Sequence, residues 1–439
     1  MKTQERIPKS RIERAAHIAG AGVKVGGNYL KHYAKKLVNA DVSREELHKD
    51  NAGDIYETLS TLKGSALKVA QMMSMDKALL PRAYAEKFQM SQYSVPPLSG
   101  PLVIQTFMRS FGKTPASLFD EFSLSASNAA SIGQVHRAVK NGRNLAVKVQ
   151  YPGVASSIRS DLKMVKPFAV QLMGLNEADV NLYSAEVEAR LLEETDYELE
   201  LRRSQEISGA CGHLPDLLFP GYYPELSSRF VLSMDWMPGL HLNEFLEKNP
   251  SQEIRDRAGQ ALWDFYEFQI HSLRQVHADP HPGNFLLQED GRVAVIDFGC
   301  IKVIPDQFYY PYFSLINPDV LREEQITVKL FEALEFLHSG DGPAERKFFI
   351  PLFQRMISML GKPFQECSFD FGDDEYFNGI YRFAEELASM PEVRNSPKAR
   401  GSRDGLYINR TYFGLYSLLN QLKARVKTHS AFLQAGVKV

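Results

Sequence analysis

The pattern of apolar and polar positions divides the chain into a helical start, a strand-rich middle and a long helical remainder. From Asp54 to Met75 apolar residues recur at steps of three and four, which predicts an amphipathic helix. Pro96-Pro97 interrupts this pattern, and a second helix is predicted at Leu102–Phe111. Strand-like segments come next, and beyond Leu242 the pattern is mainly helical. This order of elements predicts an α+β protein with two lobes.

The strands are predicted from two hairpins and one buried run. Gln134–Val139 and Leu145–Val149 flank an Asn-Gly turn, which is a strong hairpin signal. Phe285–Leu287 and Val293–Ile296 flank a second turn that contains glycine. The apolar run Arg229–Met234 is typical of a short buried strand, and a Pro-Gly break follows it.

Between the first hairpin and the buried strand, a helical pattern extends across residues 182–203. We therefore expect four segments. They are a basic, loosely ordered start at 1–53, a helical extension at 54–121, a strand-rich lobe at 122–237 and a helical lobe at 238–439.

Composition argues against several classes of protein. The 51 Lys and Arg residues nearly balance the 53 Asp and Glu residues, so bulk positive charge does not indicate binding to nucleic acid. Three distant cysteines form neither a zinc motif nor a disulfide framework, which fits a reducing compartment. The sequence shows no signal peptide at its start and no apolar run of about 18 residues. We expect a soluble, cytoplasmic protein or one bound peripherally to a membrane.

The first 40 residues are locally basic, with nine Lys and Arg side chains against Glu5 and Glu13. The simpler interpretation is a solvated, loosely ordered segment. The alternative is attachment to anionic lipid, because each basic residue near such a surface contributes about 1 kcal/mol. The sequence alone leaves both interpretations open.

The strongest chemical signal is the loop His277–Asn284, followed by Asp297-Phe298-Gly299. Phosphoryl transfer from ATP needs oxygen ligands for magnesium and a carboxylate near the attacking hydroxyl. In this pattern Asp279 is the candidate base, and Asn284 and Asp297 are the candidate Mg²⁺ ligands. Either motif alone is weak, but their order and their spacing around a hairpin argue against a chance match.

Lys148 lies inside the apolar strand Leu145–Val149, where an unpaired charge is costly. Protein kinases carry a Val-Ala-Ile-Lys strand whose lysine contacts the α- and β-phosphates of ATP. Lys148 is therefore a candidate for the same contact. Acidic partners are offered by Glu194, Asp196 and Glu200. The alternative is a structural lysine with a buried stem and an amine that reaches water.

Two further stretches are candidates for contacts with a nucleotide. Ser127–His136 takes the place of a glycine-rich loop, although it contains a single glycine. The predicted phosphate contacts are Ala129, Ala130, Ser131 and Gly133. A Pro-Gly break after a strand is typical of a kinase hinge, whose backbone groups would bind adenine. The predicted hinge contacts are Met234, Trp236 and Met237.

Together these motifs resemble the UbiB/ADCK family of atypical kinase-like proteins, also called the AarF family. The match runs from about residue 55 to the end of the second lobe. Its marks are an Ala-rich loop, an Ala-Val-Lys-Val-Gln strand, a Glu-x-Asp-Tyr motif at Glu194–Tyr197, the complete His-Ala-Asp-Pro-His-Pro-Gly-Asn loop and Asp-Phe-Gly.

The resemblance implies a two-lobed protein-kinase-like fold that binds ATP and Mg²⁺. It also implies ATPase or small-molecule kinase activity in isoprenoid-quinone (ubiquinone) or lipid metabolism, and it places Glu200 as the partner of Lys148. The family's Lys-x-Gly-Gln motif corresponds to Lys68–Gln71, on an extension that folds over the active site. Lys68 and Gln71 share a helix face, and Lys68 would meet Glu194 or Asp196.

This chain departs from the family pattern at a few positions. Ala70 replaces the glycine of the Lys-x-Gly-Gln motif, Asn128 replaces the first alanine of the Ala-rich loop, and Leu201 and Arg203 follow the Glu-x-Asp motif in place of alanine and asparagine. The candidate nucleotide and metal groups are unchanged. The departures concern how the extension packs.

Two other functions compete with this interpretation. An aminoglycoside- or choline-kinase-like phosphotransferase also favours His-x-Asp-x-His-Pro-Gly-Asn, although the Ala-rich loop and the Lys68/Gln71 helix count against it. A nucleotide-binding scaffold without catalysis would have no need of both candidate metal ligands. It would bind ATP without hydrolysing it.

Overall fold

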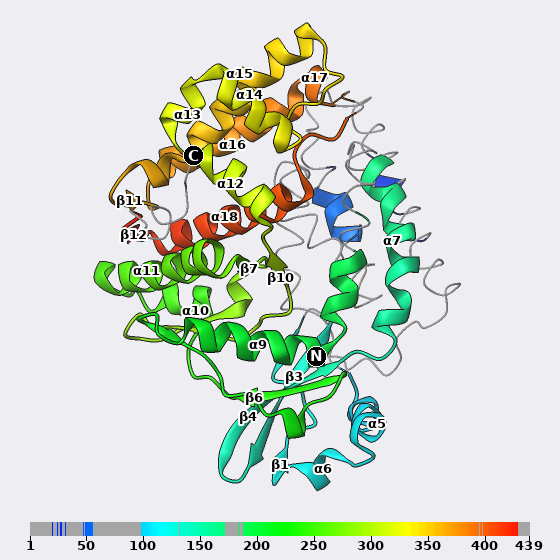
Figure 1. The fold of residues 1–439 in the computed structure, drawn as a ribbon. Coiled ribbons are helices and arrows are strands. Elements are labelled where there is room, and N and C mark those ends of the chain that lie inside the picture. Colours follow the sequence, from blue (N-terminus) through cyan, green and yellow to red (C-terminus); the bar gives the residue numbers. More distant parts are fainter. Residues whose placement is uncertain are drawn as a thin grey trace. The chain divides into compact units, whose positions relative to one another are not determined.

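The computed structural model describes residues 98–130, 132–171, 188–394, 396 and 398–428, with isolated positions at 20, 24, 27–28, 31, 47, 49–55 and 184 (Figure 1). Most of the helix predicted at 54–75 lies outside these residues. The chain divides into two compact units, and each has its own sheet and core. Unit 1 contains Met1–Arg202 and Gly221–Trp236, and unit 2 contains Arg203–Pro220 and Met237–Val439.

Unit 1 is built around an antiparallel five-stranded sheet. The strand order is β1-β3-β4-β6, with β2 paired to β3. The strands are β1 (Glu121–Phe122), β2 (Asn128–Ala129), β3 (Gly133–Lys140), β4 (Arg143–Gln150) and β6 (Val231–Asp235). The β3–β4 hairpin confirms the first predicted hairpin, and Asn141 (φ 52°) and Gly142 (φ 73°) at its tip have the left-handed backbone that a tight two-residue turn requires.

The helices of unit 1 pack on this sheet or begin beside it. They are α5 (Gly100–Phe111), α6 (Pro115–Leu118), α7 (Val154–Gln171), the short η2 (Pro224–Leu226) and the first part of α9 (Tyr197–Cys211). Helix α5 confirms the second predicted helix. It buries Val103 and Phe107, which lie one turn apart, and it ends at Gly112 in the left-handed region (φ 64°).

The single helix predicted across 182–203 is wrong. Residues 188–194 are helical, the helix stops at Thr195, and α9 starts at Tyr197. The physical reason is Asp196, whose carboxylate accepts the backbone N–H groups of Glu198 (3.1 Å) and Leu199 (3.0 Å). This is the geometry of a helix N-cap, so Asp196 begins a new helix.

Unit 2 is mainly helical and contains three small sheets. Its helices are the rest of α9, α10 (Leu242–Glu247), α11 (Gln252–Phe268), α12 (Asp306–Ser314), α13 (Pro318–Arg322), α14 (Glu324–Ala333), α15 (Pro343–Leu360), α16 (Asp374–Ser389), α17 (Pro391–Arg394) and α18 (Arg403–Leu422). Shorter helical turns are the π-type η3 (Gln269–Leu273), η4 (Pro282–Asn284) and η5 (Lys362–Gln365).

The small sheets of unit 2 are formed by short strands. These are β5 (Leu217–Leu218), β7 (Gln275–His277), β8 (Phe285–Leu287), β9 (Val293–Val295), β10 (Ile301–Val303), β11 (Phe369–Asp370) and β12 (Arg425–Val426). The β8–β9 hairpin confirms the second predicted hairpin, and β5 extends it in parallel. Strand β7 pairs with β10, and β11 pairs with β12.

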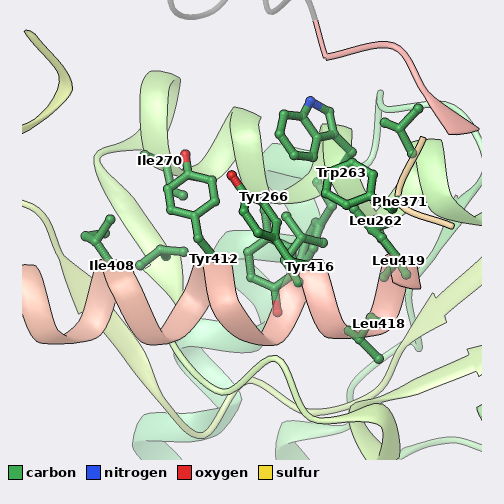
Figure 2. Close-up of a cluster of buried hydrophobic side chains, with 14 of the residues drawn as sticks. Leu262, Trp263, Tyr266, Ile270, Phe371, Ile408, Tyr412, Tyr416, Leu418 and Leu419 are labelled. Atoms are coloured by element: carbon green, nitrogen blue, oxygen red, sulfur yellow. The ribbon is translucent and has the colours of Figure 1, made fainter. Parts of the chain in front are cut away.

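The core of unit 2 is centred on α11 and α18 (Figure 2). Trp263 of α11 stacks on Tyr416 of α18, with ring centroids 6.4 Å apart. The ring of Phe371 also packs against Trp263. At Gly259 of α11 a Cβ atom would lie 2.4 Å from Ala424 Cβ, so the chain after α18 approaches α11 closely. None of the helices in the part of the chain described here has the length and hydrophobicity to span a bilayer.

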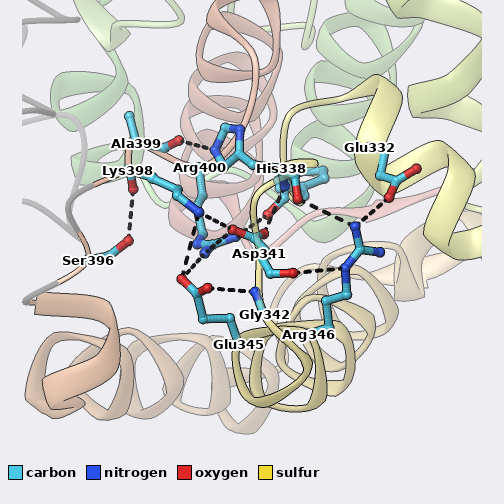
Figure 3. Close-up of polar contacts among 11 residues, drawn as sticks. Glu332, His338, Asp341, Gly342, Glu345, Arg346, Ser396, Lys398, Ala399 and Arg400 are labelled. Atoms are coloured by element: carbon cyan, nitrogen blue, oxygen red, sulfur yellow. Dashed lines mark hydrogen bonds and ion pairs between the residues drawn. The ribbon is translucent and has the colours of Figure 1, made fainter.

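A buried carboxylate ties the loop after α14 to the segment before α18 (Figure 3). Asp341 accepts hydrogen bonds from Arg400 Nη1 (2.8 Å), Lys398 Nζ (2.7 Å) and the backbone N–H of His338 (2.8 Å). Burial raises the pKa of Asp341, but the hydrogen bonds from Arg400, His338 and Lys398 outweigh burial and hold this pKa well below its usual range.

Replacing Asp341 with asparagine should destabilise the protein by about 3 kcal/mol, because it removes the nearer of the two carboxylates that pair with the buried Arg400 and leaves only Glu345. Since the folded pKa is depressed, the carboxylate stabilises the fold above about pH 4, and this contribution declines as the pH falls below that value. Urea unfolding between pH 7 and pH 3 should show a smaller acid-induced loss for the variant. The control Asp319→Asn removes an exposed ion pair with Arg322 and should leave the midpoint nearly unchanged. Equal midpoints for both variants would contradict the prediction.

Candidate active site

In unit 1 a buried ion pair joins the sheet to α9. Lys148 Nζ of β4 lies 2.7 Å from Glu200 Oε1, and both residues are 4% exposed. Charges this deeply buried are tolerated only when they are paired and hydrogen-bonded. The predicted pairing of Lys148 with Glu200 is therefore confirmed. Glu194 is also buried, but it lies on the helix that precedes α9.

The start of α9 is held in place by two contacts with the sheet. Gln150 of β4 donates its side-chain N–H to the carbonyl of Thr195 at 3.0 Å. Tyr197, the first residue of α9, is fully buried, and its ring centroid lies 5.2 Å from Lys148 Nζ. Glu200 follows Tyr197 by one turn, so these contacts bring its carboxylate to Lys148.

Gly133, the single glycine of the predicted phosphate loop, has a packing role. A Cβ atom at Gly133 would lie 2.7 Å from the hydroxyl of Tyr197 and 2.5 Å from the carbonyl oxygen of Val149. The absence of a side chain at Gly133 therefore makes room for the tyrosine of the Glu-x-Asp-Tyr motif.

The predicted phosphate loop forms a tight hairpin between β2 and β3. The N–H of Ala130 donates to Gly133 O (2.9 Å), and the N–H of Gly133 donates to Ala130 O (3.5 Å). Ala129 ends β2 and pairs with Gln134, and Ser131 lies outside the described residues. In this conformation two of the backbone donors expected to reach a phosphate are engaged within the hairpin.

The predicted hinge lies at the end of β6. Met234 is buried and pairs with Ala146 of β4. The backbone N–H of Trp236 donates to Asn144 O (2.9 Å), so the sheet already uses this expected donor to adenine. Met237 is the first residue of the second chain segment of unit 2, Met237–Val439.

In unit 2 the two candidate catalytic motifs are joined by a strand pair that the sequence did not indicate. Strands β7 and β10 pair antiparallel, and the N–H of Ala278 donates to Cys300 O (2.9 Å). Asn284 Nδ2 donates to the carbonyl of Asp279 (2.8 Å), and the N–H of Ile296 donates to Asn284 O (3.0 Å). These bonds bring together Asp279, Asn284 and the segment that carries Asp297.

The oxygen donors of this motif suit a magnesium ion. Asn284 uses its amide nitrogen on Asp279, which leaves its amide oxygen as the candidate ligand. Asp297 Oδ1 accepts the N–H of Gly299 (2.9 Å), which fixes its carboxylate. Mg²⁺ is usually held by one or two protein oxygens together with substrate phosphates. Across the described ranges no group of three His, Cys, Asp or Glu side chains forms a separate metal site.

Helix α18 supports the loop that carries Asp279. Arg410 Nη2 donates to Asp279 Oδ1 at 3.0 Å. Four residues later, Gly414 lies against the next loop residue, because a Cβ atom there would be 2.1 Å from Pro280 Cγ. One face of α18 therefore contacts two consecutive residues of the loop.

A third contact extends the same face of α18. Tyr407 packs with Ala278 and Cys300 in a small buried cluster. The residues of α18 that contact the loop were missed by sequence reasoning. Arg410 lies 131 positions after Asp279, and no local motif marks either it or Gly414.

Three predicted site residues, Lys68, Gln71 and Asp196, still need to be placed. Lys68 and Gln71 lie outside the described residues. The carboxylate of Asp196 caps α9, which gives this side chain a structural role beside the one expected from the sequence.

A family model described as the ABC1 atypical kinase-like domain matches residues 90–330, which is more than half of the chain. The chain belongs to this ABC1 family. The match confirms the resemblance to the UbiB/ADCK proteins and the kinase-like fold. It includes Lys148, Glu200 and both candidate catalytic motifs, whereas α18 lies beyond its end.

Individual ABC1 relatives are similar over most of the chain. The probable serine/threonine-protein kinase abkA of Dictyostelium discoideum is 25% identical over 458 residues, which span 97% of this chain and 79% of that protein. The atypical kinase COQ8B, mitochondrial, of Rattus norvegicus is 29% identical over 384 residues, which span 85% of this chain and 71% of that protein.

A solved structure is also similar. The complex of Rv3197 with erythromycin, from Mycobacterium tuberculosis, has a TM-score of 0.59 at 26% identity and covers 88% of this chain and 95% of that chain. The names of COQ8B and of a relative from Arabidopsis thaliana place those proteins in mitochondria and chloroplasts, so the cytoplasmic location expected here stays a prediction.

In this ABC1 protein, replacing Gly133 with alanine should lower the free energy of unfolding by about 1–3 kcal/mol, because the new methyl group overpacks Tyr197 and the β4 backbone. Removing the tyrosine hydroxyl as well, in Gly133→Ala/Tyr197→Phe, should recover part of the loss. Chemical unfolding measures the free energy of unfolding of the single and the double variant. Gly209→Ala on α9 is the control, since a Cβ atom there meets nothing within 4 Å. Equal stability of Gly133→Ala and Gly209→Ala would refute the packing role.

Proposed function

We propose that this ABC1 protein binds ATP with Mg²⁺ and transfers or hydrolyses its γ-phosphate. The observation that carries the proposal is the buried pair of Lys148 and Glu200. A buried lysine held by a helix glutamate is the arrangement with which protein kinases position the α- and β-phosphates. If the pair served stability alone, apolar side chains could replace both of its members together at little cost.

The candidate residues of unit 2 would supply the metal ligands and the base of this reaction. Asn284 and Asp297 would hold Mg²⁺, which neutralises charge on the phosphates when it is bound. Asp279 would accept the proton of the attacking hydroxyl, whether this belongs to water or to an acceptor molecule. Arg410 contacts one carboxylate oxygen of Asp279 and would thereby fix its orientation.

We place this activity in isoprenoid-quinone or lipid metabolism, with contact to a membrane surface through the basic segment at 1–40. The support is the resemblance to UbiB/ADCK proteins and the similarity to COQ8B. A second candidate is a phosphotransferase that acts on a small molecule. It is favoured by the similar solved structure, which is a complex of Rv3197 with erythromycin.

The test is ATP hydrolysis by the purified full-length protein, in Mg²⁺ and in EDTA. We expect turnover only in Mg²⁺, and we expect it to change with anionic liposomes or with a phenolic mimic of a quinone precursor. Phosphate transfer to erythromycin or another small acceptor would favour the second candidate. If ATP binds but is neither hydrolysed nor used for transfer in any of these assays, the proposed enzymatic activity is refuted. The interpretation as a nucleotide-binding scaffold would then remain.

We also propose that the helix with Lys68 and Gln71 covers the nucleotide and excludes protein substrates. Lys68→Ala keeps every candidate nucleotide ligand, so it should change the ratio of ATP hydrolysis to autophosphorylation without abolishing nucleotide binding. Radiolabelled ATP measures both activities. Lys63→Ala, five positions earlier, is the control. If Lys68→Ala matches Lys63→Ala in both activities, the cover does not exist.

A further inference from the structure

Helices α12, α15 and α18 enclose a pocket in unit 2 that the proposed phosphoryl transfer does not use. The pocket contains about 620 Å³ of empty space, which includes the part open to solvent at its mouth. Leu315 follows α12, Met356 and Ile357 come from α15, and Asn409 and Phe413 come from α18. All the residues that line it belong to unit 2.

The lining of this pocket selects against charged molecules. It consists of aliphatic and aromatic side chains, a glycine, three tyrosines and one asparagine, and it includes no Asp, Glu, Lys, Arg or His. A charged group placed here would lose its hydration without a counter-charge. An apolar molecule would gain free energy by leaving water, and its entry would cover Phe413, whose side chain is 39% exposed.

The polar groups of the lining provide one hydrogen-bond donor. The three tyrosine hydroxyls donate to protein acceptors: Tyr312 to Asn409 Oδ1, Tyr412 to Glu267 Oε1 (3.0 Å) and Tyr416 to Leu360 O (3.1 Å). Asn409 thus uses its amide oxygen on Tyr312. Its Nδ2 group has no acceptor among the residues that the structure describes, so it can donate to a ligand in the pocket.

We propose that this pocket binds a neutral, largely apolar small molecule that accepts a hydrogen bond from Asn409 Nδ2 through a carbonyl, ether or hydroxyl oxygen. Apolar contact with α12, α15 and α18 supplies most of the affinity, as in other ligand pockets, and the single amide fixes the orientation. The site does not depend on the ATP chemistry proposed above.

The test uses prodan, a neutral naphthalene ketone whose emission shifts in an apolar environment, with the full-length protein. We expect saturable binding at one site per chain. Ile357→Trp fills the pocket and should abolish the saturable signal. Ile350→Trp is the control, because Ile350 is the same residue type, two turns earlier on α15, and does not line the pocket. Absence of saturable binding, or equal binding by both variants, overturns the proposal.

Two further variants keep the proposal testable if the tryptophan disturbs folding. Phe413→Glu places a charge at an exposed lining position and should weaken prodan binding, whereas Met108→Glu, at an exposed position of unit 1, should not. Tyr312→Phe/Asn409→Leu removes the donor together with its partner and should weaken binding of the ketone up to about tenfold. Anilinonaphthalene sulfonate, which is anionic, should not compete with prodan. Full competition by this anion would show that the pocket does not select neutral ligands.

Discussion

Replacing Asp297 with asparagine should remove the stabilisation that ATP and Mg²⁺ give to the folded protein. A ligand at 100 times its dissociation constant stabilises the folded state by about 2.7 kcal/mol, so the lost thermal shift is easily measured. Asparagine keeps an oxygen that can accept the N–H of Gly299, and it is nearly the same size as aspartate. The loop should therefore stay in place while the negative charge proposed to bind the metal is lost.

The matched control is Asp290→Asn in the turn between β8 and β9. Asp290 is exposed and pairs with Arg292, seven residues before Asp297. The control variant makes the same change of carboxylate to amide at a nearby position in the sequence. The thermal shift with ATP and Mg²⁺ should be complete in this control. An undiminished shift in Asp297→Asn would refute the assignment of the metal ligand.

Replacing Gly414 with alanine should reduce ATP turnover by about 100-fold, although Gly414 is not among the residues proposed to bind the nucleotide or the metal. The new Cβ atom would lie 2.1 Å from Pro280 Cγ and 2.9 Å from Pro280 Cβ, so the loop or the helix must move by more than 1 Å. A displacement of about 1 Å at a catalytic group can cost 100-fold in rate. Asp279 precedes Pro280, so it moves with the loop.

The stability of Gly414→Ala depends on two opposing effects. Alanine favours a helix over glycine by about 1 kcal/mol, and overpacking costs about 1–3 kcal/mol. The net loss should be small compared with the loss of turnover. The control is Gly379→Ala in α16, where a Cβ atom meets nothing within 4 Å, so only the gain in helix propensity remains. Steady-state turnover measures the effect. Equal turnover by Gly414→Ala and Gly379→Ala would show that the contact does not position the loop.

The parts of the fold that could be predicted are those encoded by local patterns. The Asn141-Gly142 turn fixes the β3–β4 hairpin, because few other residues adopt its left-handed backbone. The position of Lys148 predicts an acidic partner, because an unpaired charge inside an apolar strand is costly. The two candidate catalytic motifs can likewise be recognised from a short stretch of sequence, because they follow each other closely.

Other features depend on contacts that no local pattern contains. The three-residue strands β7 and β10 are too short to show alternation, and their pairing is what brings the two motifs together. Asp196 was assigned to the interior of a helix because the apolar spacing continues across it, whereas its carboxylate caps the next helix. The packing role of Gly133 depends on the hydroxyl of Tyr197, which lies far along the chain, so the local sequence does not reveal it.

The contact between α18 and the catalytic loop has a consequence for synthesis of the protein. A chain emerges from the ribosome N-terminus first. Asp279 therefore emerges 131 residues before Arg410, the side chain that holds its carboxylate. Throughout that interval the loop lacks both the guanidinium and the helix surface at Gly414 against which Pro280 packs. A nascent or prematurely terminated chain that ends before α18 thus carries every candidate catalytic motif but not the contacts that position Asp279.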